Sequence, residues 1–255
     1  MDLPPVDHQA AIAEHSAGLA DAARCNLDTD VEHCPGWTVA DLVAHLTEVH
    51  WQWASIAERR LQTPPPAEGR PERVGDDRLV ETFEAGARRL VDVLRAADPA
   101  DQVWTWAPAQ QDVAFIVRHQ VQEAAVHHWD AVHAAGGSLE IPGPVAADSV
   151  DEFLTFSVSS DADPAKPARP PLDGSFVLAC SDVDAAWLVR DGRGPGTVAV
   201  ARSGPPPSAA GDTGAAVLTA TASDLLLWLY GRVGLDAGLA PEDVLQRFRA
   251  LCFTD

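Results

Sequence analysis

The sequence predicts an α+β protein: an antiparallel four-helix bundle followed by a small α+β domain with a mostly antiparallel sheet. Three observations indicate this fold. Four long stretches carry apolar residues at helical spacing, the links between them are mostly short or proline-rich, and short β-like segments begin only after GGSLEIPGPV at 136–145. We therefore place the helical bundle at residues 1–142 and the α+β domain at residues 143–255.

The four bundle helices are expected at residues 6–25, 39–61, 78–97 and 112–135. The second has the clearest start, because Pro35 and Gly36 break the chain and Thr38 with Asp41 forms a capping-box pattern. Its apolar residues follow the spacing of a helix that faces a core, and they are Leu42, Leu46, Val49 and Trp53.

The sequence pattern of the C-terminal part predicts a small sheet with helices. β-like segments are expected at 175–180, 185–191, 196–202 and 215–221, and helices near 147–159, from Ser223 onward and over 241–251. Ser223 is the expected cap of the middle helix, and Pro241 is expected at an early position of the last.

Composition narrows the functional classes. The 255 residues carry a net charge of −20 with 46% hydrophobic residues, which argues against binding a phosphate backbone. No apolar run approaches the ~18 residues of a membrane span, and the first residues lack a signal-peptide pattern, so a cytoplasmic location is expected. The four scattered cysteines are expected as free, buried thiols. A single lysine among many Ala, Pro and Gly residues suggests a GC-rich genome.

The stretch VQEAAVHHWDA at 121–131 carries the main candidate site. Glu123 and His127 stand four residues apart, so on a helix both side chains can reach one ion. They share a stripe with His119 and Asp130 that contains no Lys or Arg, which is unusual for a solvated face. A solvated face, an ion pair and a metal site nevertheless all fit this spacing.

A third ligand is needed, because a catalytic zinc site has three protein ligands and one open position. His45 is a candidate, since it lies within the apolar stripe of the second helix, whereas His50 falls roughly 140° away from that stripe. The alternative for His45 is an ordinary hydrogen-bonded core histidine. His33, His50 and His128 are interpreted as structural.

Three segments also resemble a known family. PGWTVADLVAHL at 35–46, EAAVHHWDA at 123–131 and LYGR at 229–232 are similar to the mycothiol-dependent maleylpyruvate isomerase family, whose N-terminal domain is a DinB-like bundle. The resemblance implies a divalent metal, usually zinc, held by His45, Glu123 and His127. It also implies mycothiol, the small thiol of actinobacteria, as cosubstrate, and a functional arginine at Arg232.

The chemistry that the resemblance implies starts from a thiol in the open metal position. The cation stabilises the thiolate, which attacks a small electrophile. The favoured hypothesis is therefore a zinc-dependent enzyme that uses mycothiol, as an S-transferase or a thiol-assisted isomerase. The alternatives are maleylpyruvate cis–trans isomerisation in aromatic catabolism, a non-catalytic protein that binds metal or a small molecule, and a metal-free bundle with a polar network.

Four further residues have two interpretations each. Asp130 either orients a ligand imidazole or makes a structural hydrogen bond. His119 is a general acid–base near the metal or a cavity wall. Trp53 lines a substrate pocket or belongs to the core. Arg232 binds a carboxylate of substrate or thiol as the catalytic arginine, or is an ordinary cation at a helix C-terminus.

Overall fold

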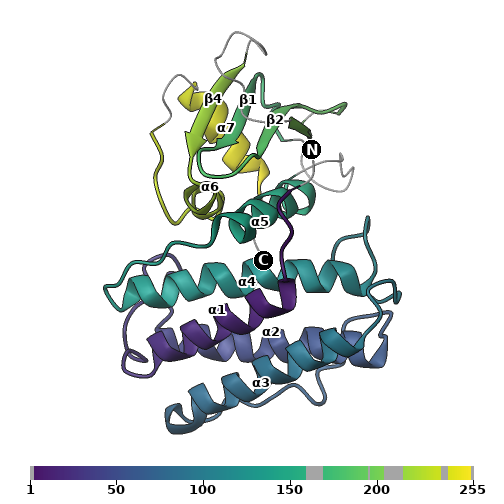
Figure 1. Cartoon of the computed structure of the whole chain (residues 1–255), viewed down its shortest axis with the longest axis vertical. Helices are drawn as coiled ribbons and strands as arrows, with labels where there is room; N and C mark the ends of the chain where they lie inside the picture. The colour runs from purple at the N-terminus through teal and green to yellow at the C-terminus, as the bar shows by residue number, and fades with distance from the viewer. Residues whose placement is uncertain (1–2, 159–168, 195, 204–214, 237–240, 254–255) are drawn as a thin grey trace. The chain divides into compact units, whose positions relative to one another are not determined.

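The computed structural model describes residues 3–158, 169–194, 196–203, 215–236 and 241–253. The chain folds into two compact units (Figure 1). One contains residues 6–141, and the other contains residues 142–255 together with residues 1–5. The first unit is helical and the second combines helices with one sheet, which confirms the predicted α+β class.

The first unit is a four-helix bundle. Its helices are α1 (His8–Ala23), α2 (Val39–Arg59), α3 (Asp76–Ala96) and α4 (Val113–Ala134). α1 packs chiefly on α4 and α3, and α2 packs chiefly on α3 and also on α4. The four helices predicted from apolar spacing are all present, with ends shifted by at most two residues.

Capping side chains fix where the site-bearing helices begin. The Thr38 hydroxyl accepts a hydrogen bond from the Asp41 backbone N–H, and the Asp41 carboxylate accepts one from the Thr38 N–H at 2.9 Å. The carboxylate of Asp112 accepts from the Phe115 N–H at 2.9 Å. The capping box predicted for α2 is thus confirmed, and both α2 and α4 start in a defined register.

The buried face of α2 is wider than its apolar stripe. Leu42, Leu46 and Trp53 are buried as predicted, but so is His50, which has no exposed surface and stacks on Phe83 of α3 with ring centroids 5.3 Å apart. His45, predicted inside the stripe, keeps 33% of its side chain exposed. His50 is thus a buried structural residue, as interpreted, and the buried face of α2 extends beyond the apolar stripe because both α3 and α4 pack on this helix.

The second unit contains a four-stranded sheet in the order β3-β2-β1-β4. Its strands are β1 (Ser175–Cys180), β2 (Ala186–Asp191), β3 (Val198–Ser203) and β4 (Ala216–Ala220). β1 pairs antiparallel with β2 and parallel with β4, and β2 pairs antiparallel with β3. The prediction of a mostly antiparallel sheet is confirmed.

Three helices complete this unit: α5 (Gly143–Phe156), α6 (Ala222–Leu229) and α7 (Glu242–Leu251). α5 packs on α6, and Phe248 of α7 contacts Phe176 of β1 edge to face. The cap of α6 is Thr221, whose side chain accepts from the Asp224 N–H at 3.1 Å, so the expectation of Ser223 is wrong by two residues. Pro241 caps α7, close to its predicted place.

The fold also bears on two expectations drawn from composition. All four cysteines are free, as predicted, although Cys180 is buried and Cys25 is exposed, so the expectation that all four are buried is wrong. Within the described segments, no helix has an apolar stretch long enough to cross a membrane.

Candidate metal centre

Helices α2 and α4 bring His45, Glu123 and His127 together. Oε1 of Glu123 lies 3.2 Å from Nε2 of His45 and 3.5 Å from Nε2 of His127. The two imidazole rings meet edge to face, with centroids 5.5 Å apart. One donor atom from each side chain lies within 4.8 Å of the other two, so the three converge on a common point.

These separations fit a small divalent cation. Zinc bonds nitrogen and oxygen ligands at about 2.0–2.2 Å, and tetrahedral geometry then places neighbouring donor atoms about 3.3–3.6 Å apart. The two measured Nε2–Oε1 distances, 3.2 and 3.5 Å, come close to this range. The donor set of two imidazoles and one carboxylate is also one that zinc accepts. The residues present therefore fit a zinc-type ion.

The electrostatics of the centre call for a positive charge. Burial would raise the pKa of Glu123, but hydrogen bonds and charge from His127 and His45 hold it well below its usual value. Burial would likewise lower the pKa of His127, but hydrogen bonds to Asp130 and Glu123 raise it to about 9. Without a metal, a proton on His127 supplies the charge that a cation would supply.

Asp130 holds the far side of the His127 ring. Its Oδ2 lies 3.0 Å from Nδ1 of His127, which leaves Nε2 facing Glu123. The Asp130 side chain is fully buried, and its Oδ2 also accepts a weak hydrogen bond from Sγ of Cys34 at 4.0 Å. A carboxylate behind a histidine in this way fixes which ring nitrogen is available to a metal.

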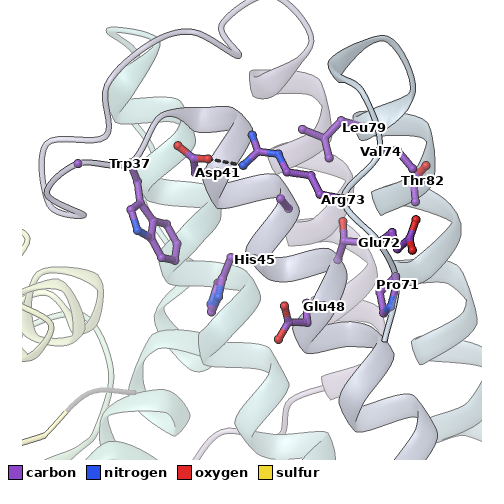
Figure 2. Close-up of a pocket in the computed structure, with 13 residues that line it drawn as sticks. Trp37, Asp41, His45, Glu48, Pro71, Glu72, Arg73, Val74, Leu79 and Thr82 are labelled. Atoms are coloured by element: carbon purple, nitrogen blue, oxygen red, sulfur yellow. Dashed lines mark hydrogen bonds and ion pairs between the residues drawn. The ribbon is translucent and has the colours of Figure 1, made fainter. Parts of the chain in front are cut away.

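His45 is one of the residues that line a cavity of about 510 Å³ (Figure 2). α2, the start of α3 and the segment 71–74 form its wall, and Trp37 lies beside His45 with ring centroids 5.0 Å apart. The lining includes Asp41, Glu48 and Glu72, and Arg73 is already paired with Asp41 at 2.5 Å. Glu48 is paired with Arg70, so arginines neutralise two of the three carboxylates, and the cavity has the size of a small-molecule site.

Residues 8–132 match the model of a protein family described as the mycothiol maleylpyruvate isomerase N-terminal domain. This range covers the four-helix bundle except the last two residues of α4, and it includes all three converging side chains. The bundle of this chain belongs to that domain family. The family resemblance inferred from PGWTV, AHL and ExxxH is thereby confirmed.

Solved structures extend the similarity to the fold of the whole chain. A crystal structure of the mycothiol-dependent maleylpyruvate isomerase matches with a TM-score of 0.58 at 15% identity, over 94% of this chain and 96% of that chain. A histidine-to-alanine mutant of that enzyme matches over the same shares with a TM-score of 0.56 and 15% identity. No curated protein sequence matches the chain.

Within the mycothiol maleylpyruvate isomerase N-terminal domain, His119 and Trp53 lie in an aromatic cluster. His119 is buried, accepts a hydrogen bond from Trp106 Nε1 at 3.4 Å and has Gln122 3.0 Å from its Nδ1. Trp53 contacts the edge of the His119 ring and stacks on Trp104. Both His119 ring nitrogens are thus engaged by side chains, and His119 is not among the converging donors.

Arg232 lies in the other unit, just beyond the end of α6. Its Nη1 donates to the Tyr230 carbonyl at 2.9 Å, and its guanidinium lies 5.7 Å from the Tyr230 ring centre. Gly231 takes the positive φ of 73° that lets the chain turn there. These contacts with Tyr230 are local and resemble those of a cation beyond a helix C-terminus.

Sequence reasoning missed three residues around the centre. Cys34 meets Asp130 and Trp37 meets His45 from the irregular segment before α2, and Arg73 reaches Asp41 from the loop before α3. Loops carry no periodic pattern that predicts where a side chain points. For Trp37, the signal available in the sequence was its place in PGWTV. In the structure, Gly36 beside it takes a φ of 85°.

Proposed function

We propose that His45, Glu123 and His127 hold one divalent metal ion, of the zinc type, and that the chain is an enzyme acting with a small thiol, mycothiol. The convergence of three donor atoms beside an open cavity carries this proposal. The family of the bundle supports the choice of thiol.

The bound metal would supply Lewis acidity that favours the thiolate form of a thiol in its open position. The side chains of this protein would orient the ligands and balance the charge of the ion. Asp130 holds the His127 ring by its Nδ1, so that Nε2 stays directed toward Glu123. Glu123 neutralises part of the cation charge in a buried setting, where water competes little.

The cavity beside His45 is where we place the reactants. Its carboxylates can accept hydrogen bonds from hydroxyl or amide groups, and Asp41 and Glu48 already pair with Arg73 and Arg70. Arg73 adds little positive potential, because Asp41 already pairs with it. This lining suits an uncharged reactant rich in donors better than a dicarboxylate, and it favours thiol S-transfer to a neutral electrophile.

Cis–trans isomerisation of maleylpyruvate is the second candidate, favoured by the name of the family that the bundle belongs to. There the thiolate adds to the activated double bond, the C–C bond rotates, and the thiol leaves unchanged. We propose that Arg232 would bind a substrate carboxylate in this case, because its planar guanidinium matches a carboxylate with two parallel hydrogen bonds.

One experiment separates these candidates. Metal-loaded protein is incubated with mycothiol and a panel of neutral electrophiles or maleylpyruvate, and products are followed by mass and by chromatography of the isomers. A conjugate indicates S-transfer, and an isomer without conjugate indicates isomerisation. The Glu123→Gln variant serves as the blank, and Glu14→Gln, an exposed glutamate on α1, is the matched control. Equal turnover by wild type and Glu123→Gln, or none by either, contradicts the proposal.

A further inference from the structure

A second group of metal-binding side chains lies at the surface of the bundle. Glu32 and His33 come from the segment between α1 and α2, and His133 from the last turn of α4. Nε2 of His133 lies 3.0 Å from Oε2 of Glu32. One donor atom from each of the three residues lies within 4.8 Å of the other two.

The two imidazoles are held in place by a neighbouring indole. The Trp129 ring stacks on His133, with centroids 4.6 Å apart and planes only 11° from parallel. His33 packs against the same indole at 5.7 Å and against His133 at 5.7 Å. The Glu32 carboxylate completes the group, and the hydrogen bond from His133 and the charge of His33 lower its pKa.

We propose that Glu32, His33 and His133 form a second divalent-metal site, separate from the centre at His45. Two imidazoles and one carboxylate are the donor types found at the centre, and they select zinc, nickel or copper over magnesium or calcium. The side chains of His133 and Glu32 are 41% and 69% exposed, so water fills the remaining positions. The net charge of −20 favours cation binding in general.

The backbone places this site directly beside the contacts that orient His127. Cys34, next to His33 in the chain, contacts Asp130, which in turn holds Nδ1 of His127. Residues 30–38 are themselves joined by backbone hydrogen bonds, including Val31 N–H to the Trp37 carbonyl at 2.9 Å. An ion at the second site therefore ties this segment to α4 and restrains the support of the centre.

The expected affinities differ because the environments differ. The centre at Glu123 is buried and holds its ion against dialysis, whereas the surface group exchanges its ion with solvent. Calorimetric titration of chelator-stripped protein with zinc should then show two equivalents of unequal affinity. His133→Gln and Glu32→Gln should remove only the weaker one, and His45→Ala only the tighter one.

His8→Gln is the matched control, because in the described part of the chain His8 belongs to no group of converging metal-binding side chains. It should keep both equivalents. Retention of the tight equivalent also shows that the His133→Gln protein is folded. A single equivalent in the wild type, a weak equivalent that survives His133→Gln, or one that His8→Gln also removes would overturn the second site.

Discussion

His127 and His128 are neighbours on α4 and lie in opposite electrostatic environments. His127 sits between the carboxylates of Glu123 and Asp130, which raise its pKa to about 9 against the effect of burial. His128 faces α1, where its Nδ1 lies 3.1 Å from Nδ1 of His15, and burial lowers the pKa of each of these two to about 4. α4 thus has a cation-demanding face, at Glu123, His127 and Asp130, and a cation-excluding face, where His128 meets His15.

The neighbours of these two histidines determine which of them can bind a metal ion. Both residues have the same side chain and the same local helix, so only their neighbours differ. A metal ion gains from carboxylates near the imidazole and from a partner that fixes the ring nitrogen. His127 has both, whereas the Nδ1 of His128 faces another imidazole, that of His15.

The largest expected effect tests the ligand that α2 contributes to the metal centre. His45→Ala should remove the tightly held metal ion, since two ligands remain of three. His50→Ala should keep it, although it lowers the free energy of unfolding by about 2–4 kcal/mol through the cavity that it leaves. Zinc titration and denaturant unfolding of both variants check this. Equal losses of metal affinity would show that the centre does not depend on His45.

Asp130→Asn tests the support of the His127 ring. An amide keeps the shape but loses the charge, and removing a partner behind a ligand histidine costs about 10–100-fold in metal affinity. Competition with a coloured chelator measures the change. Asp92→Asn, an exposed position on α3, should change nothing. An affinity unchanged in Asp130→Asn would reduce Asp130 to a structural hydrogen bond.

Gly18→Ala tests the cation-excluding face. A Cβ at Gly18 would lie 2.2 Å from Cε1 of His128, so the ring must move, at a cost of about 1–3 kcal/mol of stability. Gly86→Ala on α3 meets nothing within 4 Å and should stabilise by about 0.5–1 kcal/mol. Thermal unfolding compares the two. Metal affinity should stay unchanged in both, and a loss of metal in Gly18→Ala would mean that the two faces are coupled.

The pH dependence of stability should have two limbs in metal-free protein. His15 and His128 titrate near 6.5 when unfolded and near 4 when folded, so their contribution is full above pH 6.5 and is lost as pH falls toward 4. The contribution of His127 is full below pH 6.5 and is lost as pH rises through 9. Stability should therefore peak near pH 6.5.

Denaturant unfolding across this range checks both limbs. A bound zinc ion takes the place of the proton on His127, so zinc should remove the alkaline limb only. The double variant His15→Gln with His128→Gln should weaken the acid limb and leave the alkaline limb unchanged, and the part that remains belongs to buried His50, whose pKa burial also lowers to about 4. An alkaline limb that zinc leaves unchanged would contradict the assignment of His127.

The sequence predicted what periodicity and local chemistry determine. The four bundle helices, the capping box at Thr38 and the shared face of Glu123 and His127 all follow from spacing along one helix. Which residue of α2 meets Glu123 depends on how two helices cross, and here the family resemblance pointed to His45 where the apolar stripe alone left a core histidine possible.

Contacts made by irregular segments were beyond prediction. Cys34 and Asp130 are 96 residues apart in the chain, and the turn that joins them to one site is set by backbone hydrogen bonds around Val31 and Trp37. The shift of the α6 cap from Ser223 to Thr221 has a related cause. Thr221 and Ser223 both carry a hydroxyl group that can cap a helix. Because β4 ends at Ala220, the helix can begin directly after the strand, and Thr221 is its cap.

The metal content of the protein tests the central claim most directly. Wild-type protein and Glu123→Gln are purified without chelators, dialysed and measured by mass spectrometry of the elements. We expect one zinc or nickel ion per wild-type chain after dialysis and none in Glu123→Gln, with both proteins folded by circular dichroism. A folded wild-type protein that retains no ion, and that added zinc does not stabilise, would contradict the metal centre.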